Sequence, residues 1–549
     1  MSSTPEAFQP GVAAHRSRSR GWLALAAMAG LLLGASAGHA DDGTGDGGGR
    51  ADAYARGPNG GPAWADDAAG AARAAPVLRY SAPQSTPPVV PVFQTVVNPH
   101  GTSATYQPAG PTLTANNAFF AALGTNGRTC ASCHAASAGW SITPAQVQAL
   151  FFRTQGTDPL FQPVDGTNCS TDDVSSLPAR LRASSLLLSK GLIRIFEKLP
   201  APPTLQFGIT QVQDPYGCNT NPATGLTSYG PGATSAGFVS IYRRPLPATN
   251  LAFLSTILAD GREPTLAQQA IDANRIHAQS SLVLTAASPE IQQMVAFELG
   301  LTSAQTSSLF AGTLTGDGAR GGPIALAAQP FYLGINDAFG ADPTGQAFNQ
   351  DAYSLYSAWE SGASGYGEGH GWTGRARGAI ARGETIFNER SFTISGVAGL
   401  NDLLGQPAIS GTCSTCHDAP NAGTHSLNAK VGSAMVTPGA LVDTGVTVPG
   451  AVGIDQSALP VFTLQCNAGP LAGQSFTTTD PGRAILSGQC SDINRLKVPT
   501  LRNLAARPPY FHNGGAATLG NVVDFYNARF AMGLSRRDRE DLIAFLNAL

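Results

Sequence analysis

Hydrophobic and polar positions along the chain predict helices joined by long loops. Apolar residues recur at helical spacing over 116–124, 375–387 and 535–549. The last segment is the clearest, because its charged residues lie opposite an apolar stripe of Leu542, Ile543, Phe545, Leu546 and Leu549. Ser535 stands where an N-cap residue is expected. The pattern therefore favours a mainly α fold with long loops and little β structure.

The first 40 residues have the pattern of a secretory signal peptide. Basic residues at 15–20 precede an apolar stretch at 22–33 and small residues up to Ala40. The apolar stretch is too short to span a bilayer, which takes roughly 20 residues. We therefore expect export to the periplasm with cleavage after Ala40, and no membrane span in the mature chain. Residues 41–99, rich in Ala, Gly and Pro, are expected to form a disordered leader.

Composition narrows the functional classes. A chain of 549 residues is long enough for more than one domain. Its 33 basic and 36 acidic residues give a net charge of −3, which argues against a nucleic-acid-binding protein. Charged residues make up only 13% of the chain, whereas it contains 64 glycines and 39 prolines. This balance suits a loop-rich fold wrapped around cofactors.

Two Cys-x-x-Cys-His motifs indicate the cofactor. They consist of Cys130, Cys133 and His134, and of Cys413, Cys416 and His417. Two thiols three positions apart can bond the vinyl groups on one edge of a haem, and the adjacent histidine then binds the iron. A single motif also fits a zinc or redox site. Two copies in an exported chain predict two covalently bound haem c groups.

The other four cysteines fall into one pair in each half of the chain. An oxidising compartment favours disulfide bonds over free thiols. The order along the chain suggests the bonds Cys169–Cys218 and Cys466–Cys490, one of three possible pairings.

An apolar segment precedes each haem motif, as in small cytochrome c domains. We therefore expect two cytochrome c-like haem domains, the first at 100–300 and the second at 375–549. An insertion at 301–374 is expected to connect them. Trp140 follows the first motif closely and is expected to pack on the first haem.

Several further stretches resemble a known family. They are the Arg-Arg-Pro-Leu-Pro-Ala-Thr-Asn run at 243–250, Asp-Gly-Arg-Glu at 260–263, Thr-Leu-Ala-Gln-Gln-Ala at 265–270, Lys-Val-Pro-Thr-Leu-Arg-Asn-Leu at 497–504, and Pro-Tyr-Phe-His-Asn-Gly-Gly at 509–515 with Thr-Leu at 518–519. With the two haem motifs in this order, the chain resembles the bacterial dihaem cytochrome c peroxidases and the related MauG-type enzymes. The resemblance covers about 110–150, 240–300, and 375–549 apart from an insertion at about 420–490.

The resemblance implies a division of labour between the two haems. The N-terminal haem would bind hydrogen peroxide at an open iron. The six-coordinate C-terminal haem would receive and store electrons from a small cytochrome c or cupredoxin. Two irons suit this reaction, because peroxide reduction takes two electrons and small donors deliver one each.

The glutamate that shuttles a proton in family peroxidases is missing here. It lies about ten residues after a glutamine equivalent to Gln269, and that register falls on Gln279. His277 could shuttle the proton instead, because an ordinary histidine titrates near neutrality. It could equally bind the first iron, or be a partly buried histidine bonded to the backbone. Gln269 and His277 are therefore the candidate catalytic residues.

Two other family features differ. Ala259 stands where the family commonly has a tryptophan that relays electrons between the haems. Arg244 and Arg507 take the positions that usually supply an asparagine and a threonine to a calcium ion. Guanidinium groups cannot coordinate a cation, so no calcium is expected. The two groups would replace the ion and bond haem propionates, unless they are ordinary surface arginines.

The sixth ligand of the second haem has several candidates. The family's methionine, or the tyrosine of MauG, aligns with Tyr526. Tyrosine would lower the redox potential and methionine would raise it. Met532 and Met435 are the alternatives, followed by a histidine such as His425 or His512, or no ligand.

Three functions are compatible with these features. The leading one is a dihaem peroxidase that reduces hydrogen peroxide. The second is a MauG-like oxidase that acts on an organic or protein substrate, favoured by Tyr526 and by the missing glutamate. The third is a non-catalytic dihaem electron-transfer protein, which His277 would favour if it were an iron ligand.

Overall fold

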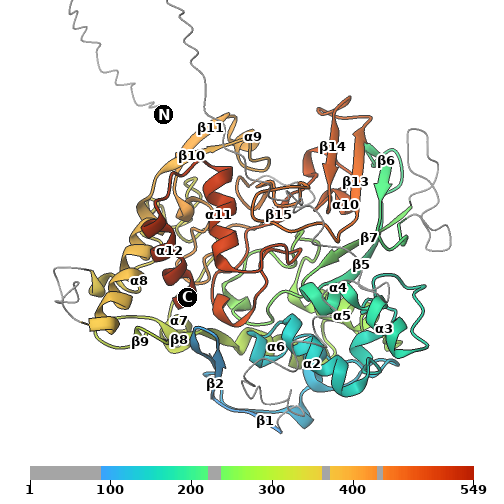
Figure 1. Cartoon of the computed structure of the whole chain (residues 1–549), viewed down its shortest axis with the longest axis horizontal. Coiled ribbons are helices and arrows are strands. Elements are labelled where there is room, and N and C mark those ends of the chain that lie inside the picture. The colour runs from blue at the N-terminus through green and yellow to red at the C-terminus, as the bar shows by residue number, and fades with distance from the viewer. Residues whose placement is uncertain (1–87, 220–236, 361–370, 429–436) are drawn as a thin grey trace, which may run out of the picture. The chain divides into compact units, whose positions relative to one another are not determined.

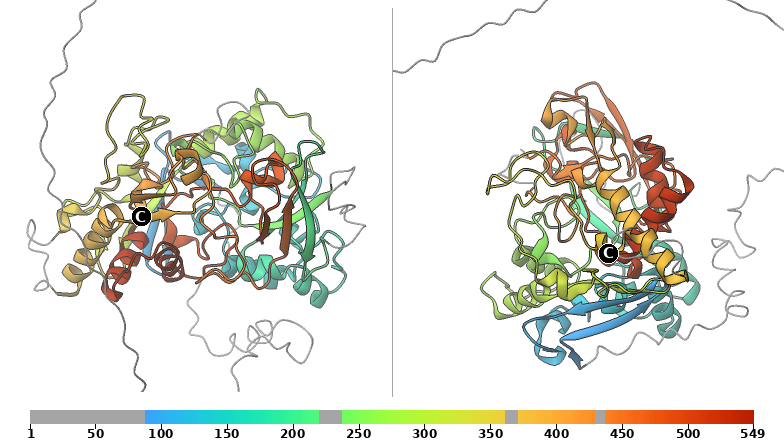
Figure 2. Two further views of the ribbon diagram at one scale, coloured as in Figure 1. Left: turned by 90° about the horizontal axis from the view of Figure 1, so that it is seen from above. Right: turned by 90° about the vertical axis from the view of Figure 1, so that its left-hand side faces the viewer.

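Two long helices near the C-terminus pack together beneath the second haem motif. The computed structural model describes residues 88–219, 237–360, 371–428 and 437–549. Helix α8 (Gly371–Glu389) crosses α12 (Arg536–Ala548), and α11 (Leu519–Arg529) packs on α12, as Figure 1 and the right-hand view of Figure 2 show. The side chain of Ser535 accepts a hydrogen bond from the amide of Asp538, which confirms the predicted helix and its N-cap.

Gly383 lets α8 and α12 approach closely. A side chain at this position would meet the backbone carbonyl of Asp541 on α12. The core around the contact combines aliphatic and aromatic side chains, among them Phe387 and Phe545, both essentially buried. The predicted helix over 375–387 is therefore confirmed, and its small residues serve the packing.

The apolar segment before the first motif is shorter than expected. Instead of a helix over 116–124, two 3-10 turns form at Thr114–Asn116 and Ala118–Phe120. The side chain of Asn117 accepts a hydrogen bond from the amide of Phe119, so it ends one turn and caps the next. The segment still buries Phe119 completely.

The other helices are spread over both halves of the chain. α5 (Leu266–Ile276) and α6 (Pro289–Gly300) pack on each other near the first motif. The remaining described helices are α2 (Pro144–Thr154), α3 (Leu177–Ala183), α4 (Ser185–Lys190), α7 (Gly322–Ala327), α9 (Asn401–Leu404) and α10 (Ala484–Ser487). None of the described helices is both long and apolar enough to cross a membrane.

The prediction of a mainly α fold with little β structure is wrong. Helices make up 31% and strands 18% of the structure, and the strands form several antiparallel sheets. The largest has the order β2-β3-β8-β9, with bounds Phe93–Asn98, Gly101–Tyr106, Thr302–Ser308 and Gly312–Thr313. Its central strands read GTSATY and TSAQTSS, and half of their Ser and Thr side chains are buried. Because few of these residues are apolar, the hydrophobic pattern did not reveal the strands.

A second sheet joins two segments far apart in the sequence. Strand β13 (Val461–Cys466) pairs with β6 (Phe207–Gln213) on one side and β14 (Ser475–Thr478) on the other, in the order β14-β13-β6 (Figure 1). The smaller pairings are β1 (Val89–Val90) with β4 (Thr112–Leu113), β5 (Ile193–Lys198) with β7 (Phe238–Arg243), β10 (Phe392–Ser395) with β11 (Ala408–Gly411), and β12 (Leu441–Val442) with β15 (Leu496–Lys497).

The two disulfide bonds pair as predicted. Cys169 is bonded to Cys218 and Cys466 to Cys490, with Cα atoms 5.2 and 6.1 Å apart. Cys466 is the last residue of β13, and Cys218 follows β6 closely in the sequence.

Four expectations lie outside the described residues or stay predictions. The signal peptide, most of the leader and Met435 fall outside the described ranges. The domain boundaries stay a prediction. Strand β8 belongs to the expected connecting insertion, yet it pairs with β3 in the first expected haem domain.

Candidate functional site

The two Cys-x-x-Cys-His motifs have the same backbone structure. Each starts with a 3-10 turn, at Cys130–Ser132 and at Cys413–Thr415. A threonine precedes each turn and forms a capping box with its third residue. In both motifs the histidine amide donates to the carbonyl of the first cysteine, at 3.0 Å. The local sequence therefore presents two thiols and an imidazole in the same way twice.

The two motif histidines are prepared to bind a metal through Nε2. The Nδ1 atom of His134 lies 3.0 Å from the carbonyl oxygen of Trp140, and that of His417 lies 2.6 Å from the carbonyl oxygen of Gly423. A carbonyl can only accept, so Nδ1 carries the proton and Nε2 keeps its lone pair. Burial lowers the pKa of His134, and it lowers the pKa of His417 to about 4. Both imidazoles are therefore neutral near pH 7, as an iron ligand must be.

The motif cysteines are the ones that the disulfide bonds leave free. They are partly exposed, and burial raises the pKa of Cys133, Cys413 and Cys416 to about 12. An aromatic ring faces each histidine: Phe119 lies 6.3 Å from His134, and Phe387 lies 6.1 Å from His417, between ring centroids. Thiols, neutral imidazoles and apolar rings together fit covalent haem attachment.

Comparison with known proteins agrees with this geometry. The chain is 41% identical to the cytochrome-c peroxidase IdrP2 of Denitromonas iodatirespirans over 78 residues, 13% of this chain and 21% of the relative. It is 37% identical to cytochrome c551 peroxidase of Nitrosomonas europaea over 105 residues, 16% of this chain and 30% of the relative. Over these segments the chain is similar to bacterial proteins named cytochrome c peroxidases.

The matches are local. They span less than a third of the length of these curated relatives. A solved structure described as a MauG-like protein associated with microbial copper homeostasis aligns with 58% of this chain and 76% of its own, at 15% identity and a TM-score of 0.29. No protein-family model matches. The relatives' names nevertheless support haem c as the cofactor.

His277 forms a close pair with an aspartate that the sequence did not reveal. It caps the C-terminal end of α5, and its Nδ1 lies 2.5 Å from Oδ2 of Asp165. The other oxygen of Asp165 pairs with the buried Arg128, whose guanidinium also donates to the His277 carbonyl. Burial would raise the pKa of Asp165, but the hydrogen bond from His277 and the charges of His277 and Arg128 outweigh it and lower that pKa. Asp165 is therefore an ionised carboxylate that orients the imidazole.

The other ring nitrogen of His277, Nε2, remains available for proton transfer or for binding iron. The side chain is 38% exposed, so it is reachable from solvent. Among the causes that lower the pKa of His134, after burial, is the charge of His277, which places the two imidazoles close enough to interact. The geometry fits proton transfer and iron ligation alike.

The two glutamines are less informative. Gln269 lies in the first half of α5 and is partly buried. Gln279 has a positive φ of 55° and an exposed side chain. The position that corresponds to the missing glutamate therefore faces solvent.

A buried glutamate lies near the first motif. Glu298 on α6 is 7% exposed, and burial raises its pKa to about 8. Its charge is one cause of the raised pKa of Cys130, so the two side chains are neighbours. The sequence pattern does not identify Glu298, because this residue lies within the apolar pattern of helix α6.

Tyr526 lies beside the second motif. Burial raises the pKa of its phenol, and the next causes are the neighbouring thiols of Cys416 and Cys413. Met532 follows α11 and is buried. Met294 lies in the core, with its sulfur 3.3 Å from the side-chain nitrogen of Asn274.

The two remaining histidine candidates pair with aspartates. His512 lies 3.5 Å from Asp480, and burial lowers its pKa to about 4. His425 contacts Asp418 and Asp337.

Arg244 and Arg507 are engaged with backbone carbonyls. Arg244 is buried and donates to the carbonyl oxygens of Ile142, at 2.6 Å, of Arg507, at 2.9 Å, and of Pro509. Arg507 donates to the carbonyl of Thr500 at 2.7 Å. Carbonyl oxygens are calcium ligands, and here guanidinium groups bind them. The two residues are therefore not free surface arginines.

Proposed function

We propose that the protein is a periplasmic dihaem c-type oxidoreductase that reduces hydrogen peroxide with electrons from a small cytochrome c or cupredoxin. Two equivalent motifs support two haems, and relatives named cytochrome c peroxidases support this substrate. When bound, haem would supply an iron for peroxide to bind and would store electrons. The chain's own residues would handle the protons.

The His277–Asp165 pair is the observation that carries the proposal. Reduction of hydrogen peroxide takes two electrons and two protons, yields two waters and breaks the O–O bond. Nε2 of His277 would accept a proton from one peroxide oxygen and return it to the departing oxygen. Asp165 would hold the ring and stabilise its protonated form, since its oxygen lies 2.5 Å from Nδ1. Glutamine at position 279 could not carry that proton.

A MauG-like oxidase is the second candidate. Tyr526 supports it, because its phenol lies beside the thiols of the second motif. A phenolate ligand would stabilise ferric iron and favour oxidation of an organic or protein substrate over electron uptake from a cytochrome.

Spectroscopy of the holoenzyme separates the candidates. The protein is reduced by one electron, its spectrum is recorded, and peroxide and a reduced small cytochrome are then added. A high-spin iron together with cytochrome oxidation is the expected result. A long-lived oxidised state that does not oxidise the reduced cytochrome would indicate the MauG-like oxidase. Two low-spin irons that do not react with peroxide would contradict both enzymatic functions. They would instead indicate an electron-transfer protein in which His277 is an iron ligand.

We also propose that Arg244 and Arg507 replace the calcium ion of the family. Both guanidinium groups already bind the carbonyl oxygens that a cation would need. Metal analysis of the purified protein is expected to find no tightly bound calcium. One calcium ion per chain that survives dialysis would refute this proposal.

A further inference from the structure

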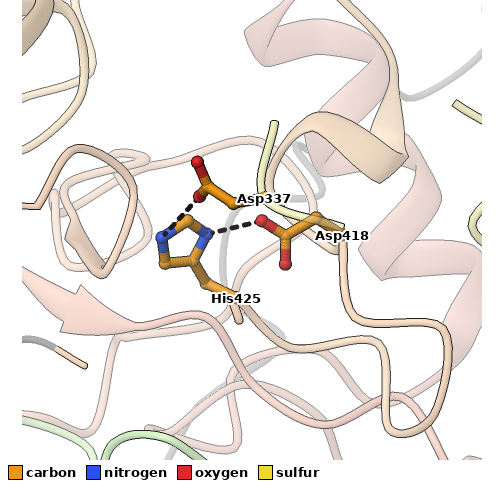
Figure 3. A group of neighbouring side chains, drawn as sticks. All are labelled: Asp337, Asp418 and His425. Atoms are coloured by element: carbon orange, nitrogen blue, oxygen red, sulfur yellow. Dashed lines mark ion pairs between the residues drawn. The ribbon is translucent and has the colours of Figure 1, made fainter. Parts of the chain in front are cut away.

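A buried group of two aspartates and a histidine lies beside the second motif, outside the sites described above. Asp418 directly follows His417, His425 lies at the end of the same loop, and Asp337 comes from the segment after α7 (Figure 3). The exposed fractions are 0% for each aspartate and 2% for the histidine. Two separate stretches of chain thus converge on one buried point.

The polar atoms that face one another are not satisfied. Nδ1 of His425 lies 2.9 Å from Oδ2 of Asp418, and Nε2 lies 3.8 Å from Oδ1 of Asp337. None of these atoms has a hydrogen-bond partner of proper geometry among the described residues, nor does Oδ1 of Asp418. Unsatisfied buried polar atoms are costly, so a group of five in one place calls for a ligand.

The charges of the cluster point to a cation. Oδ2 of Asp337 accepts two backbone N–H groups, from Phe339 and Ala341, both at 2.9 Å. The other oxygen of Asp337, Oδ1, faces His425. In the described parts of the chain, neither aspartate pairs with a lysine or arginine. A divalent cation could accept one oxygen from each carboxyl group and one nitrogen from the imidazole, which would satisfy these facing atoms together.

We propose that Asp337, Asp418 and His425 form a site for a divalent cation of the zinc type. One ring nitrogen and one oxygen from each carboxylate lie within 4.8 Å of one another. Around a tetrahedral zinc ion, with bonds of about 2.0–2.2 Å, ligand atoms lie roughly 3.4 Å apart, so a small inward movement closes the site. The imidazole ligand favours zinc over calcium, which prefers oxygen ligands. Water would complete the coordination.

The position of the site suggests what the cation does. It would tie the loop 418–425 to the segment around Asp337, where Asn336 also donates to the Asp418 carbonyl at 2.9 Å. The same loop carries the Gly423 carbonyl that holds the His417 ring. The cation would therefore fix the loop that orients the second haem's histidine. This role does not depend on the reaction proposed above.

Elemental analysis of the holoprotein tests the proposal. Wild-type protein purified without chelator is expected to contain one zinc ion per chain. His425→Ala and Asp337→Asn are expected to lose it. His512→Ala is a matched control, because His512 is also largely shielded from solvent and faces an aspartate, and this variant should keep the metal. Zinc retained in both site variants would overturn the proposal.

Wild-type protein provides a test that does not require the variants to fold. Its zinc is removed with EDTA, and the melting temperature is then followed while ZnCl2 or CaCl2 is added. A rise that saturates at one zinc per chain, and is absent with calcium, is expected. No stoichiometric zinc and no response to added zinc would overturn the proposal, as would a response to calcium alone.

Discussion

Asp165 changes how His277 should be understood. A histidine at the end of a helix could be a ligand, a proton carrier or a structural side chain. The carboxylate of Asp165 fixes Nδ1, and Arg128 in turn fixes Asp165, so the ring cannot turn to offer that nitrogen elsewhere. Only Nε2 remains available, and this arrangement suits the proton transfer proposed above as well as iron ligation.

Substitution of this pair is expected to slow peroxide turnover. His277→Gln removes the proton carrier and should lower kcat at least 100-fold, in line with the usual size of general acid–base catalysis. Asp165→Asn keeps the size of the side chain but loses its charge, so it should lower kcat less, by about 10-fold. Steady-state assays with a reduced cytochrome measure both.

His100→Gln serves as the control for the His277 variant. His100 lies in the exposed turn between β2 and β3, and its loss should leave kcat unchanged. Full activity in His277→Gln, with haem content intact, would mean that the proton travels by another group, for which the buried Glu298 beside Cys130 is a candidate.

Tyr526 is expected to determine the state of the second haem. Tyr526→Phe removes the phenol beside the thiols of Cys413 and Cys416, and it should change the ferric absorption spectrum and raise the redox potential of one haem only. Potentiometric titration followed by visible spectra measures this change. Met532→Leu should leave both properties unaltered. The opposite result, with Met532 decisive, would assign the methionine as ligand.

The close contact between α8 and α12 requires a residue without a side chain, Gly383. Gly383→Ala would push a methyl group into the Asp541 carbonyl and is expected to lower the free energy of unfolding by about 1–3 kcal/mol. Chemical denaturation measures the loss. Gly300→Ala at the end of α6 meets no atom within 4 Å and should be nearly neutral. Equal stability of the two variants would show that α8 can shift away from α12 at little cost.

Helices with strong patterns were predictable and strands without them were not. The segment 535–549 combines an apolar stripe with an N-cap, and helix α12 follows it almost residue for residue. In 116–124, the apolar spacing is similar but Asn117 hydrogen-bonds locally and breaks the helix. Strands β3 and β8 bury Ser, Thr and Ala, which carry no alternating apolar signal.

The candidate site was predictable only where it is local in sequence. The haem motifs each span five residues, so thiol and imidazole positions follow from the sequence. The His277–Asp165 pair joins residues 112 positions apart, and Asp165 lies in a stretch without any recognisable motif. Only the fold could bring such residues together.

A buried network of ion pairs joins segments that are far apart in the sequence. Arg243 at the end of β7 pairs with Asp480 through two contacts of 2.6 and 2.9 Å and also with Asp260. Burial would raise the pKa of Asp480, but the charge and hydrogen bond of Arg243 outweigh it and lower that pKa to about 2. Asp480 belongs to an insertion, whereas Asp260 belongs to the family's Asp-Gly-Arg motif. The network therefore anchors the insertion to the part of the chain that resembles the family.

Asp480→Asn is expected to destabilise the whole chain by about 3–5 kcal/mol, because it leaves Arg243 buried and underpaired. The folded pKa lies below the ordinary value of 3.8, so the contribution of Asp480 is complete above that pH and is lost as pH falls towards 2. Unfolding free energies measured from pH 6 to pH 2 should converge for wild type and variant. Asp524→Asn, in an exposed pair with Arg539, should cost little at any pH.

The sheet that joins β6 to β13 has a consequence for the ancestry of the protein. Each strand lies in an insertion that the resemblance to the family does not cover. Neither insertion forms the complete sheet alone. Acquiring one without the other would leave an unpaired strand edge and an open apolar face. The two insertions are therefore expected to have been inherited as a pair. A relative that lacks the residues of β13 should also lack those of β6, which makes the joint presence of both segments a marker for a distinct lineage.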